Sequence, residues 1–153
     1  ITEDGKEEET ITRLSRVGYD NVLGYLNGGI EAWEKAGNEA GKIESIPVEE
    51  LSERMKAGNE INVIDVRKPS EFEAEHIADV VNFPLDFINK NMAELDPEKT
   101  YTIHCAGGYR SMIASSILKA RGIKVVDVAG GFAAIQKSEL FETTAFVCPS
   151  TLK

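Results

Sequence analysis

Apolar runs alternate with helix-forming segments along most of the chain. Residues 61–66 are a run of Val and Ile that suits a strand buried on both faces, which is typical of a parallel sheet. Pro47 opens a helix whose first turn holds Glu49 and Glu50. The same reasoning predicts strands at 43–46, 61–66, 100–104 and 124–128, an extended segment at 77–84, a short turn at 70–72, and helices at 48–56, 86–91, 110–121 and 132–137. Strands that alternate with helices predict an α/β fold, a doubly wound parallel sheet flanked by helices.

Two parts of the chain share an order of residue types. Residues 18–33 parallel residues 122–135, because each reads as a glycine stop, a short strand, a Gly-Gly turn and a new helix. We therefore predict that residues 1–40 are the C-terminal remnant of an upstream copy, that residues 41–142 are a complete domain, and that residues 143–153 are a tail. Because the chain begins at Ile1 in a charged stretch, we expect it to be part of a longer protein.

Composition and charge exclude several classes of partner. The chain has 153 residues and a formal net charge of −9, and an acidic chain without a basic stripe argues against binding to nucleic acid or to anionic membranes. No apolar run reaches membrane-spanning length, and no signal-peptide pattern is present. Cys105 and Cys148 are too few for a disulfide framework, and no Cys/His cluster has zinc-site spacing. We predict a protein of the reducing cytoplasm that uses no metal or cofactor.

The candidate chemistry lies in the loop that follows the strand predicted at 100–104. Cys105 falls at the carboxyl end of this strand, the edge where open α/β sheets bind ligands. Gly107 and Gly108 permit backbone angles closed to other residues, so successive N–H groups can turn toward one point. The helix that follows directs its free N–H groups to the same point. Such a cradle lowers the pKa of a thiol, and Arg110 can present its planar fork to a sulfonate or carboxylate of the donor.

The sequence Cys105-Ala-Gly-Gly-Tyr-Arg110-Ser111 resembles the active-site loop of rhodanese-like sulfurtransferase domains. Other landmarks of that family follow in order: Val63-Ile-Asp65-Val-Arg67, Glu71-Phe72, His76-Ile77, Asn82-Phe83-Pro84-Leu85 and Gly130-Gly131-Phe132. The resemblance covers about residues 43–137. It implies a cysteine persulfide intermediate, no metal and a six-residue loop from cysteine to arginine. Related phosphatases of the same fold have one more residue in this loop, so the spacing favours sulfur over phosphate.

Each residue of the loop receives a predicted role. Cys105 is the catalytic nucleophile, and the substrate-binding residues are Ala106, Gly107, Gly108, Tyr109, Arg110 and Ser111. Asp65, Arg67 and Glu71 are structural support, as a buried pair or loop brace with Glu71 as a further partner. Neighbours on a strand point to opposite faces, so His104 is not expected to act as the base of Cys105. His76 braces a turn, Trp33 packs within residues 1–40, and Cys148 is an incidental or a sulfur-relaying thiol.

The leading hypothesis is a sulfurtransferase that moves a sulfane sulfur from a small-molecule donor, either thiosulfate or a thiol persulfide such as glutathione persulfide, to a thiol acceptor. Arg110 is the only cation of the loop, which favours the thiol persulfide over a small dianion. The alternatives are a non-catalytic interaction module and a Cys-dependent phosphatase or arsenate reductase. The arrangement of a partial copy followed by a complete copy also resembles that of bacterial proteins in which a metallo-β-lactamase-fold persulfide dioxygenase precedes rhodanese-like domains. In a truncated copy, residues 1–40 would expose an apolar strand and helix, which would favour a homodimer or swapped pairing of two chains.

Overall fold

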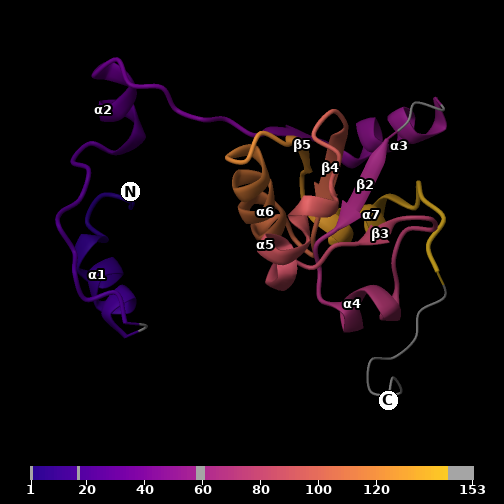
Figure 1. The fold of residues 1–153 in the computed structure, drawn as a ribbon, viewed down its shortest axis with the longest axis horizontal. Coiled ribbons are helices and arrows are strands. Elements are labelled where there is room, and N and C mark those ends of the chain that lie inside the picture. Colours follow the sequence, from indigo (N-terminus) through magenta and orange to yellow (C-terminus); the bar gives the residue numbers. More distant parts are fainter. Residues whose placement is uncertain (1, 17, 58–60, 145–153) are drawn as a thin grey trace. The chain divides into compact units, whose positions relative to one another are not determined.

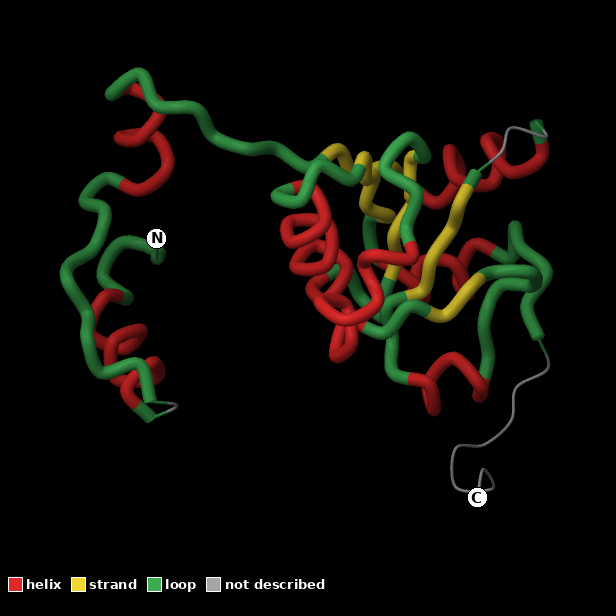
Figure 2. The backbone as a smooth tube through the Cα atoms, viewed as in Figure 1, coloured by secondary structure: helices red, strands yellow, loops and turns green. Residues whose placement is uncertain are grey.

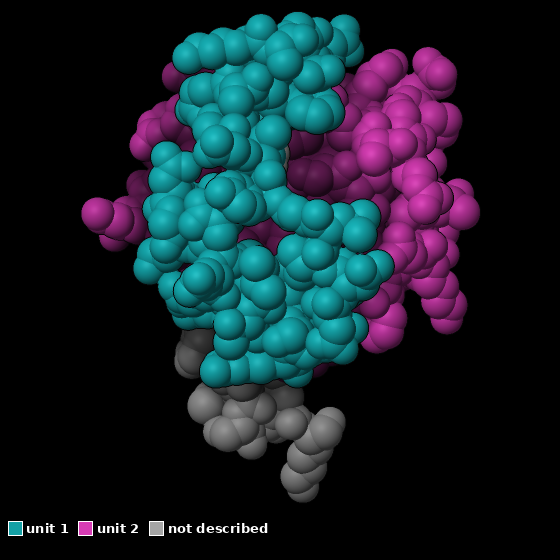
Figure 3. Space-filling model, turned by 90° about the vertical axis from the view of Figure 1, so that its left-hand side faces the viewer, with its two compact units in different colours: residues 1–42 teal, residues 43–153 magenta. Residues whose placement is uncertain are grey.

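A computed structural model describes residues 2–16, 18–57 and 61–144 of the chain. The chain divides into two compact units, residues 1–42 and residues 43–153 (Figure 3). Among the described residues, none of the helices combines the length and the apolar character needed to cross a bilayer.

The first unit consists of two helices and their connections. α1 (Glu7–Ser15) carries three glutamates in its first turn, and α2 (Gly29–Lys35) begins at the second glycine of the Gly-Gly turn. The short strand predicted between them does not form, since residues 19–26 are irregular. A strand needs a neighbour for its backbone hydrogen bonds, and this unit offers none within its described residues. Trp33 is 41% exposed, and its indole N–H donates to Glu39 O.

The second unit contains the predicted parallel sheet. Its five strands lie in the order β1-β5-β4-β2-β3, and every neighbouring pair is parallel (Figure 1). The strands are β1 (Glu44–Ile46), β2 (Asn62–Asp65), β3 (Val81–Asn82), β4 (Thr100–His104) and β5 (Lys124–Val128). β4 lies in the middle, so the loop after it opens at the centre of the carboxyl edge. This arrangement confirms the predicted doubly wound α/β fold.

Helices connect the strands (Figure 2). Their bounds are α3 (Val48–Lys56), α4 (Pro69–Ala74), η1 (Leu85–Phe87), α5 (Ile88–Asn91), η2 (Met92–Glu94), α6 (Tyr109–Lys119) and α7 (Gly131–Ser138). The turn predicted at 70–72 is a longer helix, α4, because Pro69 pre-sets its first turn and the Glu71 side chain accepts the Lys68 N–H. The extended segment at 77–84 contributes only two residues to the sheet.

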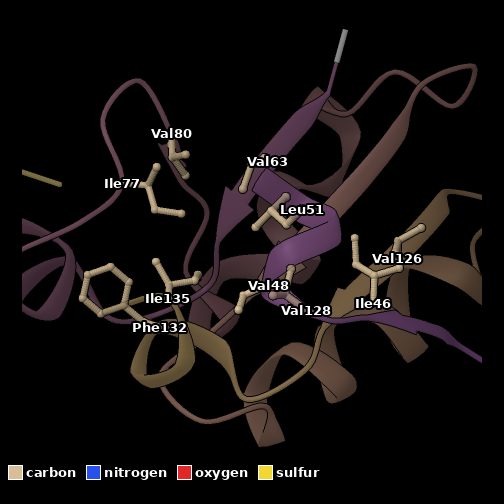
Figure 4. Packing of buried hydrophobic residues seen from close by; sticks show 10 residues of the cluster. All are labelled: Ile46, Val48, Leu51, Val63, Ile77, Val80, Val126, Val128, Phe132 and Ile135. Carbon is tan, nitrogen blue, oxygen red and sulfur yellow. The ribbon is translucent and has the colours of Figure 1, made fainter. Parts of the chain in front are cut away.

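Side-chain alternation along the strands builds a separate core on each face of the sheet. Val63 of β2 packs in the cluster of α3 and α7 (Figure 4), whereas its neighbour Ile64 packs in the cluster of α5 and α6. The first cluster contains Ile46, Val48, Leu51, Val63, Ile77, Val80, Val126, Val128, Phe132 and Ile135. Cys105 belongs to the second cluster, and is therefore packed on the α6 side of the sheet.

Candidate active site

Cys105 follows β4 directly and starts the loop that leads into α6. Its side chain is buried, with 1% of the residue exposed. Gly108 has a φ of 103°, in the left-handed region that favours glycine, and its N–H donates to Cys105 Sγ at 3.2 Å. α6 begins at the next residue, Tyr109. The loop thus turns back so that its backbone faces the sulfur, as the cradle hypothesis predicts.

Four hydrogen-bond donors act on the thiol. Burial raises the pKa of Cys105, but the Ser111 hydroxyl and the N–H groups of Ser111, Gly108 and Gly107 outweigh burial and lower the pKa below its ordinary value. The Ser111 hydroxyl also lies 3.0 Å from Gly108 O, and its one proton serves one acceptor at a time. An ionised sulfur is the better acceptor of the two because it carries a full charge.

Only one of the two loop glycines uses a special conformation. Gly107 has no positive φ, and a Cβ built on it would meet no atom within 4 Å. The prediction that both glycines need angles closed to other residues is therefore wrong for Gly107. What this position contributes is its N–H group, which any residue except proline also carries.

The N-terminus of α7 binds the loop through two backbone hydrogen bonds. Phe132 N–H donates to Cys105 O at 2.6 Å, and Ala133 N–H donates to Ala106 O at 3.0 Å. The C=O and N–H of a trans peptide point in opposite directions, so holding Ala106 O against α7 turns the Gly107 N–H away from α7 and toward the sulfur. Sequence reasoning missed these two contacts, for which the Gly-Gly-Phe landmark is the only signal.

Arg110 is paired within the domain. Its Nη1 and Nη2 donate to Glu71 Oε2 and Oε1 at 2.6 and 2.8 Å, which is a bidentate pair between α6 and α4. The guanidinium thus faces Glu71, and its predicted contact with a donor stays a prediction. Glu71, expected as a further partner of the Asp65–Arg67 pair, hydrogen-bonds to Arg110 instead. The pair forms because α4 presents Glu71 from its first turn. The hydrogen bonds from Arg110 lower the pKa of Glu71, despite the opposing effect of burial, and the charge of Arg67 also helps to lower this pKa.

Asp65 and Arg67 form the buried pair expected of them. Arg67 Nη2 donates to Asp65 Oδ2 at 2.6 Å and to Glu75 O at 2.7 Å, and Arg67 Cζ lies 3.8 Å from the centre of the Phe132 ring. Asn82 Nδ2 donates to Asp65 O at 2.9 Å and to Arg67 O at 3.0 Å. The loop after β2 is thereby tied to the same Phe132 whose N–H holds Cys105 O.

The remaining candidates lie farther from the chemistry. His104 is fully buried and stacks against Phe132 on the face opposite Cys105, in line with the expectation that it is not the base. Burial lowers the pKa of His104. His76 Nδ1 lies 2.7 Å from Phe72 O and braces the end of α4. Tyr109 is 81% exposed at the start of α6. Cys148 lies outside the described residues.

Comparison with known proteins decides the family. Residues 47–138 match the rhodanese-like domain. The chain belongs to the rhodanese-like domain family. It is 36% identical over 70 residues to the thiosulfate sulfurtransferase PspE of Escherichia coli, a match that covers 44% of this chain and 67% of PspE.

Two further relatives extend the comparison of this rhodanese-like domain. The match to YrkF of Bacillus subtilis is 32% identical over 99 residues and covers 64% of this chain, so the chain spans about half the length of that relative (54%). A crystal structure of a rhodanese-related protein from Thermoplasma volcanium has a TM-score of 0.60 and 32% identity, and the match covers 66% of this chain and 97% of that chain.

Proposed function

We propose that this rhodanese-like domain is a sulfurtransferase that carries sulfur as a persulfide on Cys105. The thiolate attacks the outer sulfur of thiosulfate or of a thiol persulfide such as glutathione persulfide, and sulfite or the donor thiolate leaves with the electron pair of the broken S–S bond. A thiol acceptor then attacks the terminal sulfur of the Cys105 persulfide. This second step gives a persulfide of the acceptor and restores the Cys105 thiolate.

The observation that carries this proposal is the set of donors directed at Cys105 Sγ. They lower the pKa of the thiol without a dedicated base, which makes the sulfur a standing nucleophile. The same backbone N–H groups suit the negative charge of the persulfide that forms. The similarity to PspE, a thiosulfate sulfurtransferase, supports the same reaction, as does the six-residue spacing from Cys105 to Arg110.

Mass spectrometry after separate incubations with thiosulfate and with glutathione persulfide tests the proposal. We expect the chain to gain the mass of one sulfur atom, and the Cys105→Ser variant to gain none. Titration of the Cys105 alkylation rate with iodoacetamide should give a pKa below that of free cysteine. A chain that gains no sulfur from either donor would favour the non-catalytic interaction module. Hydrolysis of p-nitrophenyl phosphate without sulfur uptake would favour the phosphatase alternative.

Finer predictions accompany this proposal. We propose small-molecule donors and a thiol acceptor as partners, a location in the reducing cytoplasm, and pairing of two chains through residues 1–40. We also propose an upstream persulfide dioxygenase of the metallo-β-lactamase fold in the parent protein. Sedimentation of the full chain tests the pairing, because a sedimentation coefficient of a monomer at micromolar concentration contradicts it. The sequence of the parent protein tests the fusion.

A further inference from the structure

We infer that Glu71 is a specificity-determining residue, which neutralises Arg110 beside the loop and thereby selects a thiol persulfide over thiosulfate as the sulfur donor. The inference rests on the proposed function and deepens it by naming the donor class. Glu71 acts through Arg110 and is not among the groups that act on the sulfur, so it is a positioning residue. The sequence alone suggested a weakly charged site, and the structure identifies the group that removes the charge.

The Glu71 carboxylate occupies the edge of the Arg110 guanidinium to which a sulfonate would bind. Arg110 Nη1 and Nη2 each donate to a different oxygen of Glu71, at 2.6 and 2.8 Å. This is the planar, bidentate arrangement by which arginine binds an oxyanion such as a carboxylate or sulfonate. Thiosulfate must therefore displace the Glu71 carboxylate before it can use the same two donors. The 28% and 35% exposed side chains of Arg110 and Glu71 are within reach of a solute.

Glu71 is fixed in this position by its own helix. It lies in the first turn of α4, and Glu71 Oε2 accepts the Lys68 N–H at 3.2 Å. The pKa of Glu71 is lowered, first by the hydrogen bonds from Arg110, so the carboxylate stays charged at neutral pH. The Arg110 charge is thus cancelled by a group that is both ionised and held in place, and displacement by a solute carries a cost.

A second arginine, Arg67, is also paired with a carboxylate. Arg67 donates through Nε and Nη2 to Asp65, and only 5% of the residue is exposed. The groups that act on Cys105 Sγ are instead backbone N–H groups and the Ser111 hydroxyl. These groups act on the charge of the sulfur itself, and neither they nor the paired Arg67 supplies the full positive charge that a thiosulfate dianion would gain from an unpaired Arg110.

The two donors differ in the charge that the leaving group carries away. When the Cys105 thiolate takes the outer sulfur of thiosulfate, the new bond joins Sγ to that sulfur, and the old S–S bond breaks with its electron pair on sulfite, a dianion. When the donor is glutathione persulfide, the pair leaves on a glutathione thiolate with a single charge at the reacting atom. A free guanidinium favours the first leaving group more than the second. Neutralised Arg110 removes that advantage.

Glu71→Gln tests the inference, because glutamine has nearly the same shape but no charge. We would measure the second-order rate constant of Cys105 persulfide formation with thiosulfate and with glutathione persulfide. We expect the ratio of the thiosulfate constant to the persulfide constant to rise about fivefold to tenfold, the size of one partly exposed charged contact. The rise should appear mainly as a lower KM for thiosulfate in steady-state assays.

Three further variants separate this effect from a structural one. Glu73→Gln removes the same charge from an exposed position of α4 and should leave the ratio unchanged. Glu71→Gln combined with Arg110→Gln should lose the gain, because the gain acts through the guanidinium. Glu71→Ala should reproduce the rise if Glu71→Gln proves unstable in a thermal melt.

The outcomes distinguish the inference from the proposed function. A wild-type chain that forms no persulfide from either donor overturns the proposed sulfurtransferase function and the inference with it. A wild-type chain that forms the persulfide, with a Glu71→Gln ratio that stays the same or falls, overturns the inference alone. If the Glu71→Gln variant forms the persulfide equally more slowly with both donors, the inference is also overturned, because Glu71 would then have only a structural role.

Discussion

Replacing Gly131 with alanine is a direct test of how α7 holds the active loop. An alanine Cβ at this position would lie 2.4 Å from Cys105 O and 3.0 Å from the carbonyl carbon and oxygen of Ala106. These are backbone atoms, so no side chain can rotate away to relieve the contact. Gly131 also has a φ of 56°, which an alanine adopts only with strain. The loop and the start of α7 must therefore separate.

The expected cost follows from these contacts. Positive φ costs an alanine about 1 kcal/mol, and overpacking against the backbone costs about 1–3 kcal/mol. Separation relieves part of the overpacking, but it lengthens the bond from Phe132 N–H to Cys105 O, now 2.6 Å, which is worth about 1 kcal/mol. We expect the free energy of unfolding to fall by about 2–4 kcal/mol. The pKa of Cys105 should rise at the same time, because the loop peptides lose their orientation.

Urea denaturation measures the first effect, and the pH dependence of Cys105 alkylation by iodoacetamide measures the second. Gly107→Ala is the matched control within the same loop, since its Cβ meets no atom within 4 Å and its φ is not positive. We expect this control to change the free energy of unfolding by less than about 0.5 kcal/mol. A Gly131→Ala variant with the stability and alkylation profile of the control would refute the close approach of α7.

The other predictions concern the buried charges. Asp65→Ala leaves the Arg67 guanidinium buried without its carboxylate, so we expect the free energy of unfolding in urea to fall by about 3–5 kcal/mol, and by less when Arg67 is also replaced with methionine. Neither ring nitrogen of His104 has a hydrogen-bond partner among the described residues, and burial lowers its pKa. The unfolded chain then binds the proton more readily, so stability is complete above pH 6.5, the ordinary histidine pKa, and declines below it. His104→Leu should remove that part of the decline in thermal melts between pH 7 and 5; an unchanged decline would contradict the assignment.

The sequence predicted most elements of the second unit because local pattern and fold agree there. The strands at 100–104 and 124–128 and the helix at 48–56 have the bounds that apolar runs and Pro47 indicate. Residues 18–22 share such a pattern, yet they form no strand. A strand depends on a partner elsewhere in the chain, which a local pattern does not contain. The interpretation of residues 1–40 as a remnant of an upstream copy stays a prediction.

The site was predictable in part for a related reason. The position of Cys105 after a central strand and the role of Gly108 follow from local sequence, because strand, glycine and helix are neighbours in the chain. The pairing of Glu71 with Arg110 joins residues 39 positions apart and depends on where α4 packs. The sequence places both side chains at the site but predicts a different partner for each. Spacing along the chain carries no information about such a contact.

Two of the family landmarks outside the loop, Arg67 and Gly130-Gly131-Phe132, help to fix the conformation of the loop. The first four residues of the loop, 105–108, are Cys, Ala and two glycines, so the conformation of this part has to be fixed mainly through its backbone. α7 binds two of its carbonyls, and Arg67 lies over the Phe132 ring of that same helix. The Ala106 carbonyl that faces α7 leaves the opposite end of its peptide, the Gly107 N–H, free to face the sulfur. The lowered pKa of Cys105 therefore depends in part on α7 and on the loop after β2, which lie far from Cys105 in the sequence but hold the backbone of its loop.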